Sequence, residues 1–220
     1  MKTLLITKKD LDKDNFYKKD EVGKYDEYEN VNLEIDENLD WVRFKKGVYV
    51  NGSIFAKAGS GIKAGWGIKA GWGIKAGSGI EAGEGIKAGE GIEAGYGIKA
   101  GWGIKAGEGI EAGYGIKAGS GIEAGYGIKA GSGIEAGEGI VSVYSWIKAK
   151  LKIVFDARCT ISAGIFSYDG EKEIEAEEIV GGKVIYGKVK LLPKPEAKTG
   201  KKIKIRLAEG NIVEGEIVED

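Results

Sequence analysis

A six-residue unit repeats without interruption through the middle of this chain. The unit reads Ile-(Lys/Glu)-Ala-Gly-x-Gly, and its isoleucines fall at every sixth position from Ile62 to Ile140. Because side chains alternate between the two faces of a strand, the Ile and Ala of each unit share one face and the charged residue takes the other. A helix would be destabilised by ~1 kcal/mol at each glycine. The repeat therefore predicts short extended Ile-x-Ala segments joined by Gly-x-Gly corners.

Each unit offers only one Ile and one Ala for burial, which is too little apolar surface to offset the entropy lost on ordering six residues. Coils must therefore stack on one another and fold as a single array. We expect an all-β, parallel β-solenoid with N- and C-terminal elements that cover its ends.

The charged position of the repeat indicates how many units make one coil. From residue 63 to residue 135 this position reads K K K E K E K K E K E K E. If residues 18 apart lie in neighbouring coils, six of ten stacked pairs have opposite charge, whereas a spacing of 12 gives three of eleven. Like charges on adjacent strands are destabilising. The pattern favours a triangular coil of three units and predicts pairs such as Lys63 with Glu81 and Glu81 with Lys99.

The sequence on either side of the array divides the chain further. We predict an N-terminal cap at 1–48, the regular solenoid at 49–144 and a degenerate continuation of the solenoid at 145–192. In the continuation, apolar residues still alternate with polar ones, but glycines are fewer. After the continuation, two prolines, Pro193 and Pro195, interrupt strand pairing. A C-terminal β-hairpin is expected at 193–220, where two alternating segments flank a Gly-Asn turn.

The repeat resembles the left-handed β-helix of hexapeptide-repeat proteins, since a small residue follows the inward position of each unit. In this chain the large inward residue comes first, as Ile62 precedes Ala64 and Gly65. The resemblance implies a β-helical shape. The acyltransferases of that family use a histidine base, and this chain has no histidine. We therefore do not expect their activity here.

The same lack of histidine excludes Ser-His-Asp and Cys-His nucleophile systems and the usual histidine-containing metal sites. Cys159, the single cysteine, lies in an apolar alternation and is expected to be a buried structural thiol. Glutamates recur with the repeat rather than in one unique place, which is typical of a solvated charge ladder. We predict a protein that is not an enzyme and that has no cofactor.

The net charge and the N-terminal sequence indicate which partners and which cellular location to expect. The chain has 33 basic and 34 acidic residues, so it carries no strong net field to attract duplex nucleic acid or an anionic membrane. The apolar run within Met1–Thr7 is too short for a signal peptide. We expect a cytoplasmic protein of a bacterial host, with a protein partner and no direct contact with duplex nucleic acid or membrane.

Aromatic residues recur at the variable fifth position of the repeat, flanked by glycines. They are Trp66, Trp72, Tyr96, Trp102, Tyr114 and Tyr126. A core already filled by Ile and Ala has little room for them, so we expect them at the corners as candidate binding residues. Three interpretations remain open. A terminal segment covers them, a partner protein binds them, or a glycan stacks on them.

The sequence leads to one functional hypothesis and two alternatives. The hypothesis is a non-enzymatic protein-interaction module, such as a phage or mobile-element inhibitor of a host defence protein. The first alternative is a self-assembling structural polymer of β-helical units, and the second is a glycan-binding surface protein. Homo-oligomers would form through a solenoid end or through the C-terminal hairpin.

Overall fold

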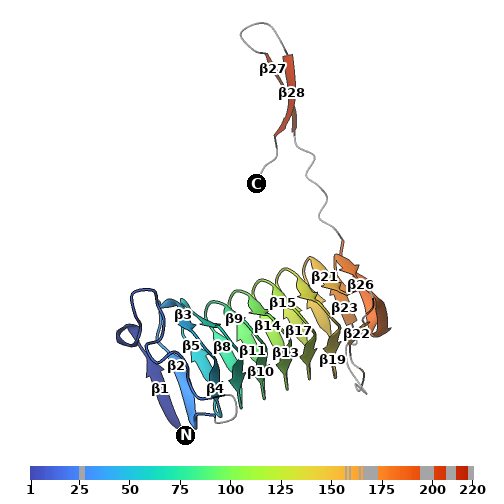
Figure 1. Ribbon diagram of the computed structural model, residues 1–220. Helices are drawn as coiled ribbons and strands as arrows, with labels where there is room; N and C mark the ends of the chain where they lie inside the picture. The colour runs from blue at the N-terminus through green and yellow to red at the C-terminus, as the bar shows by residue number, and fades with distance from the viewer. Residues whose placement is uncertain are drawn as a thin grey trace.

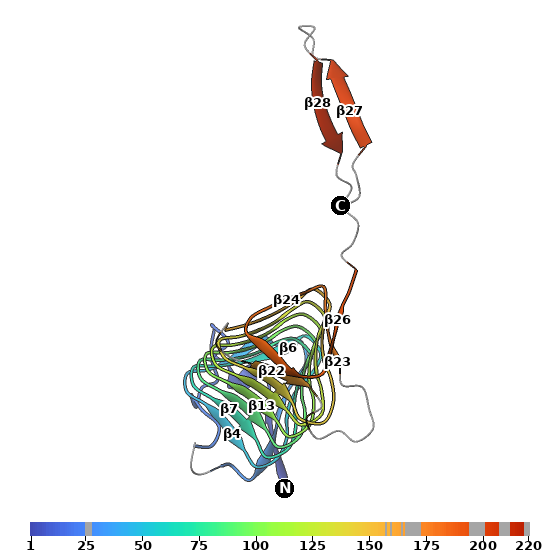
Figure 2. The ribbon, with the colours of Figure 1, turned by 90° about the vertical axis from the view of Figure 1, so that its right-hand side faces the viewer.

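The computed structural model is an elongated parallel β-solenoid of about eight coils with three flat sides (Figure 1). It describes residues 1–24, 28–156, 158, 160–163, 165, 173–193, 201–206 and 212–217, the last two stretches by their backbone alone. Seen along its axis, the coils superimpose as a rounded triangle (Figure 2). The predicted all-β solenoid with coils of 18 residues is confirmed.

Each side of the triangle is one parallel sheet, formed by every third strand. The ten-stranded sheet contains β1 (Lys2–Ile6), β2 (Val31–Ile35), β5 (Ile54–Ala56), β8 (Ile74–Ala76), β11 (Ile92–Ala94), β14 (Ile110–Ala112), β17 (Ile128–Ala130), β20 (Ile147–Ala149), β23 (Glu173–Ala176) and β26 (Lys188–Leu191).

The other two sheets have eight strands each and are called the β3–β24 sheet and the β4–β25 sheet. The β3–β24 sheet contains β3 (Asp40–Phe44), β6 (Ser60–Ala64), β9 (Ile80–Ala82), β12 (Ile98–Ala100), β15 (Ile116–Ala118), β18 (Ile134–Ala136), β21 (Lys152–Phe155) and β24 (Glu178–Val180). The β4–β25 sheet contains β4 (Val48–Val50), β7 (Ile68–Ala70), β10 (Ile86–Ala88), β13 (Ile104–Ala106), β16 (Ile122–Ala124), β19 (Ile140–Ser142), β22 (Thr160–Ala163) and β25 (Lys183–Tyr186).

The core is a set of aliphatic ladders that run along the axis. In neighbouring coils Ile pairs with Ile and Ala pairs with Ala, as in β10 and β13, where Ile86 faces Ile104 and Ala88 faces Ala106. From Ile62 to Ala136 the Ile and Ala of every unit are 0–3 % exposed. The even period thus places both apolar residues of each unit inside, as the sequence predicts.

The first glycine of each unit is required by the close approach of successive coils. A Cβ added to Gly83 would lie 2.0 Å from the carbonyl oxygen of Gly65, and one added to Gly101 would lie 2.0 Å from that of Gly83. None of the glycines within the regular units has a positive φ. Glycine can serve a corner by adopting a positive φ or by letting two backbones approach closely. In these units it serves by close backbone approach between coils.

The N-terminal end of the solenoid is covered by the chain itself. After β1 and the 3₁₀-helix η1 (Lys8–Asp10), an irregular segment makes isolated parallel bridges to the next coil, Phe16 with Arg43 and Val22 with Val48. Strands β2 and β3 already belong to the regular stack of sheets. Within the predicted cap at 1–48, β1 therefore adds the first strand to the ten-stranded sheet, and the described residues 7–24 and 28–30 cover the end. Complete three-sided coils begin at Val31.

The C-terminal end has no described covering. Strands β20 to β26 continue the three sheets in parallel register through Leu191, within the segment predicted as a degenerate continuation. Beyond them, β27 (Lys201–Arg206) and β28 (Ile212–Ile217) pair antiparallel with each other, as the predicted hairpin requires. Cys159 and Pro195 lie outside the described residues, so the prediction of a buried thiol stays a prediction.

Candidate interaction surface

The six aromatic candidates lie on the three corners of the triangle, two on each corner. A hydrogen-bonded backbone column runs up every corner, because each fifth-position amide donates to the fifth-position carbonyl one coil earlier, as Trp102 N does to Glu84 O at 3.2 Å. The three columns are Trp66, Glu84, Trp102, Ser120 and Glu138; Trp72, Glu90, Glu108 and Tyr126; and Ser78, Tyr96, Tyr114 and Ser132.

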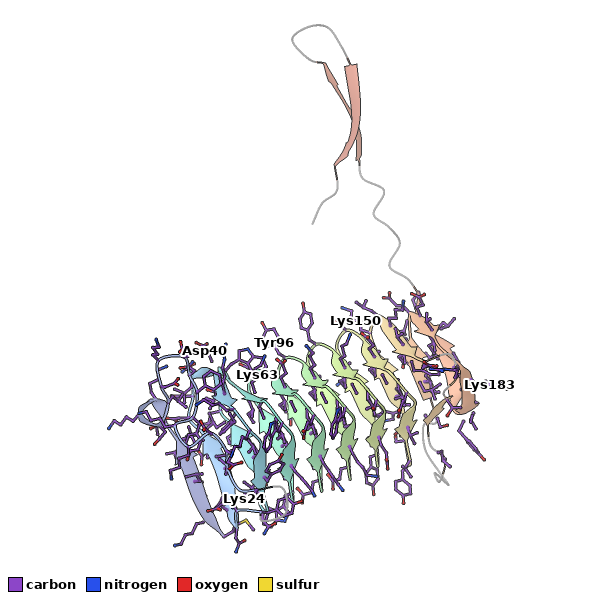
Figure 3. All side chains as sticks on the ribbon, in the orientation of Figure 1. Lys24, Asp40, Lys63, Tyr96, Lys150 and Lys183 are labelled. Carbon is purple, nitrogen blue, oxygen red and sulfur yellow. The ribbon has the colours of Figure 1, made fainter. Side chains whose placement is uncertain are left out.

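All six aromatic side chains point outward. They are 48–63 % exposed, although large apolar groups gain by burial. Figure 3 shows Tyr96 on the outer edge of the stack. One interpretation of these residues was that a terminal segment of the chain covers them. No such segment is found among the described residues.

The structure brings two of the predicted residues into direct contact. The rings of Tyr96 and Tyr114 stack with centroids 5.8 Å apart and an interplanar angle of 13°. Tyr126 packs against Tyr144 in a tilted arrangement, with centroids 5.5 Å apart and an interplanar angle of 37°. Tyr144 is not among the candidates predicted from the sequence, although its distance of 18 residues from Tyr126 is the signal that could have identified it.

Lysine side chains of the chain itself already lie over two tryptophans, the corner residue Trp66 and Trp146, which directly precedes Ile147. Lys46 Nζ lies 5.9 Å from the centroid of the Trp66 ring, and Lys148 Nζ lies 5.5 Å from that of Trp146. Such contacts are worth about 0.5–1 kcal/mol at exposed sites. The rings are thus positioned to accept a cationic group from another molecule.

Each side of the solenoid carries a long shallow groove beside a corner column. The groove volumes are about 530 Å³ on the β4–β25 sheet, about 630 Å³ on the ten-stranded sheet and about 470 Å³ on the β3–β24 sheet. Their floors include the second glycine of each unit, such as Gly91 and Gly109, which adds no side chain to fill them. These grooves are not among the features predicted from the sequence, and the recurring second glycine is the one signal that points to them.

Outward charges flank the grooves and form ladders along the axis. All six pairs of opposite charge that the spacing of 18 predicts are ion pairs in the structure. They are Lys63–Glu81, Lys75–Glu93, Lys99–Glu81, Lys105–Glu123, Lys117–Glu135 and Lys129–Glu111, with N–O distances of 2.7–3.9 Å. Because they are exposed, each contributes roughly 0.2–1 kcal/mol at most.

The remaining stacked pairs place like charges next to each other, and the sign of these charges differs between the sides of the solenoid. On the β4–β25 sheet, Lys87 pairs in register with Lys69 below and Lys105 above. On the ten-stranded sheet, Glu93 pairs in register with Glu111. The three sides therefore share one backbone design but present different electrostatic surfaces.

The described residues contain no group of three or more acidic or cysteine side chains placed to hold a metal ion. Within the same residues, no helix is long and apolar enough to cross a membrane. The sequence matches no protein-family model, and no curated protein or solved structure matches it.

Proposed function

We propose that this chain is a non-enzymatic module that binds another protein through the corner columns and the grooves beside them. The observation that carries the proposal is the outward position of six large aromatic side chains, 48–63 % exposed, on a scaffold that buries its other regular apolar residues almost completely. Exposed aromatic groups in contiguous patches mark interaction sites, and aromatic residues are enriched at protein interfaces.

The rigid backbone supports the same proposal. Coil-to-coil hydrogen bonds and closely packed glycines hold the corner residues in fixed register, with one residue per coil. Coils are spaced at about 4.8 Å, so a partner meets a regular row of side chains that loses little entropy when it binds. We also propose that the chain is similar to hexapeptide-repeat β-helices in shape, and this similarity does not extend to their activity. The narrower hypothesis of a phage-encoded inhibitor stays a prediction.

The repeat supplies the variant that tests the proposal. Serine occupies the fifth position at Ser78, Ser120 and Ser132, so replacing all six aromatics by serine keeps a residue that the fold already accepts. The control replaces those three serines by glutamate, which is also native to this position. Each tagged protein is incubated with a bacterial lysate, and captured proteins are quantified by mass spectrometry.

We expect a protein retained by the original chain and by the control and lost from the six-serine variant, with unchanged circular dichroism for all three. Equal capture by the six-serine variant would contradict the proposal. Capture of polysaccharide instead, with quenching of tryptophan fluorescence, would favour the glycan-binding alternative.

One observation favours the second candidate, a self-associating structural protein. Among the described residues, the C-terminal end has unpaired strand edges and exposed apolar side chains, such as Ile185 and Leu191, which are 59 % and 62 % exposed. Such edges can pair with another chain. Light scattering as a function of concentration tests this candidate, because a polymer grows with concentration whereas a binding module keeps a constant mass.

A further inference from the structure

We propose that the groove on the ten-stranded sheet binds an extended protein segment rich in lysine and arginine. This inference rests on the proposed function and names the class of partner for one of the three sides. It begins from the shape of the groove, which at about 630 Å³ is the largest of the three.

The groove follows the solenoid axis along β5, β8, β11 and β14 and ends at the corner that precedes β17. Its floor includes Gly73, Gly91, Gly109 and Gly127, so a bound backbone can approach the sheet closely. Aromatic rings lie at its two ends, Phe55 at one and Tyr126 with Trp146 at the other. Four coil spacings of about 4.8 Å separate β5 from β17, a distance that about six residues of extended chain would span.

Two rows of carboxylates line the middle of this groove, each over two successive coils. Glu90 and Glu108 form one row on the corner column, where Glu108 N donates to Glu90 O at 3.3 Å. Glu93 and Glu111 form the other row on the sheet, in direct register. Lys75 is the one basic residue among the lining residues.

The chain neutralises one row and leaves the other without ion pairs. Glu93 pairs with Lys75 at 2.9 Å, and Glu111 pairs with Lys129 at 2.7 Å. Glu90 and Glu108 form no ion pair with any described residue. Stacked like charges cost free energy, and the repeat accepts serine at this position, so the fold itself does not require these two carboxylates.

The spread of the charge indicates an extended ligand. No three of the described acidic residues converge on a metal ion, and the four carboxylates lie along the groove over two successive coils. Basic side chains of an extended segment would meet the carboxylates, and those near the groove ends would lie over aromatic rings, as Lys148 already lies over Trp146. Phosphate backbones of nucleic acids would be repelled.

The other two grooves do not fit this partner. In the groove on the β4–β25 sheet the charges balance, because three lysines and three glutamates line it: Lys69, Lys87, Lys105, Glu84, Glu123 and Glu138. In the groove on the β3–β24 sheet the three lysines Lys99, Lys117 and Lys152 outnumber the two glutamates Glu81 and Glu135. Charge complementarity therefore selects one side of the solenoid.

The test measures binding of a fluorescein-labelled peptide of about eight residues that alternates arginine with valine, by fluorescence anisotropy with the full chain. The decisive variant is Glu90→Ser with Glu108→Ser. Its matched control is Glu84→Ser with Glu138→Ser, the same substitution at the same repeat position on a different corner. A peptide alternating glutamate with valine serves as the control ligand.

We expect the arginine peptide to bind the original chain, and the Glu90/Glu108 variant to weaken its affinity by about tenfold, with a reduced dependence on salt. The Glu84/Glu138 control should retain the affinity, and the glutamate peptide should not bind. Equal weakening by both variants, or no binding of the arginine peptide, would overturn the inference.

The two proposals fail in distinguishable ways. If the arginine peptide does not bind but a lysate protein is still lost from the six-serine variant, the partner class is wrong and the binding function stands. If the six-serine variant captures the same proteins as the original chain, the binding function itself is contradicted, whatever the peptide does.

Discussion

The two ends of the solenoid differ in how deeply they bury apolar side chains. At the N-terminal end, Leu11, Tyr17 and Val22 are buried, and the ring of Tyr17 packs 5.5 Å from that of Phe44. At the C-terminal end, Val184 and Val189 occupy the inward positions opposite Ile161 and Ile174, yet they are 38 % and 46 % exposed.

This difference shows that inward position and burial are separate properties in a solenoid. Alternation along a strand decides which side chains face the axis, but a side chain is buried only when another layer lies above it. The described residues within 1–30 supply that layer at one end. Among the described residues nothing supplies it at the other, so unpaired edges of β24, β25 and β26 remain there.

The largest expected effect comes from removing the covered end. Deletion of residues 1–30 would expose the rung that contains Leu33, Phe44 and Val48, together with the edges of β2, β3 and β4. We expect this protein to aggregate, as measured by size-exclusion chromatography with light scattering. Deletion of residues 194–220 is the control and should leave a soluble protein. A soluble, monomeric protein after the first deletion would remove the contrast between the ends.

A matched pair of leucines tests the contrast with single substitutions. Leu11 is 5 % exposed and Leu191 is 62 % exposed. Leu11→Ala should lower the free energy of unfolding by about 2–5 kcal/mol, because it leaves a cavity. Leu191→Ala should change it by less than about 0.5 kcal/mol. Urea denaturation measures both, and similar losses would mean that Leu191 is buried in solution.

The covered end should also be sensitive to acid. The backbone N–H and the hydroxyl of Thr7 both donate to Asp10 Oδ2 at 2.8 Å, and these hydrogen bonds lower the pKa of Asp10 below its usual value of 3.8. A carboxyl whose pKa is lowered in the folded state contributes stability above its unfolded pKa and loses it as the pH falls through the folded pKa.

We therefore expect amide exchange in β1 to accelerate as the pH falls below about 4, after correction for intrinsic rates, and Asp10→Asn to remove that pH dependence. Loss of this cap should cost about 0.5–1 kcal/mol at neutral pH. The amides of β26 at the open end provide the internal comparison. An unchanged acid response in the variant would assign the effect to another group.

The smallest effect on stability is expected at the open end. Ile185→Lys replaces an exposed apolar side chain, so the melting temperature should change by less than about 2 °C. Binding of the dye ANS, which reports exposed apolar surface, should fall. A marked loss of stability would show that a partner, a second copy or residues 194–220 cover this end.

The regular part of the fold could be predicted from the sequence because each of its causes is local. The even period fixes which residues face the axis, and the order of Lys and Glu identifies the three-unit coil, with all six expected ion pairs present. The sequence predicts that the aromatic residues lie at the corners. It does not predict how exposed they are, because alternation alone does not decide whether a corner side chain turns outward.

The path of residues 1–30 could not be predicted, because Leu11, Tyr17 and Val22 follow no period. Their burial depends on the coil beneath them, as the bridges of Phe16 to Arg43 and Val22 to Val48 show. The grooves were missed for a related reason. Each arises from glycines in several coils, and no single unit contains enough of the groove to reveal it.

The glycine contacts between coils have a consequence for how such an array can change in length. Since Gly83 packs on Gly65 and Gly101 packs on Gly83 in the same way, one coil is interchangeable with the next. Insertion or loss of three units would lengthen or shorten the rod while every surface stays aligned. Insertion of a single unit would instead turn all later surfaces by one third of a revolution, so that residues now aligned on one side would be divided between two.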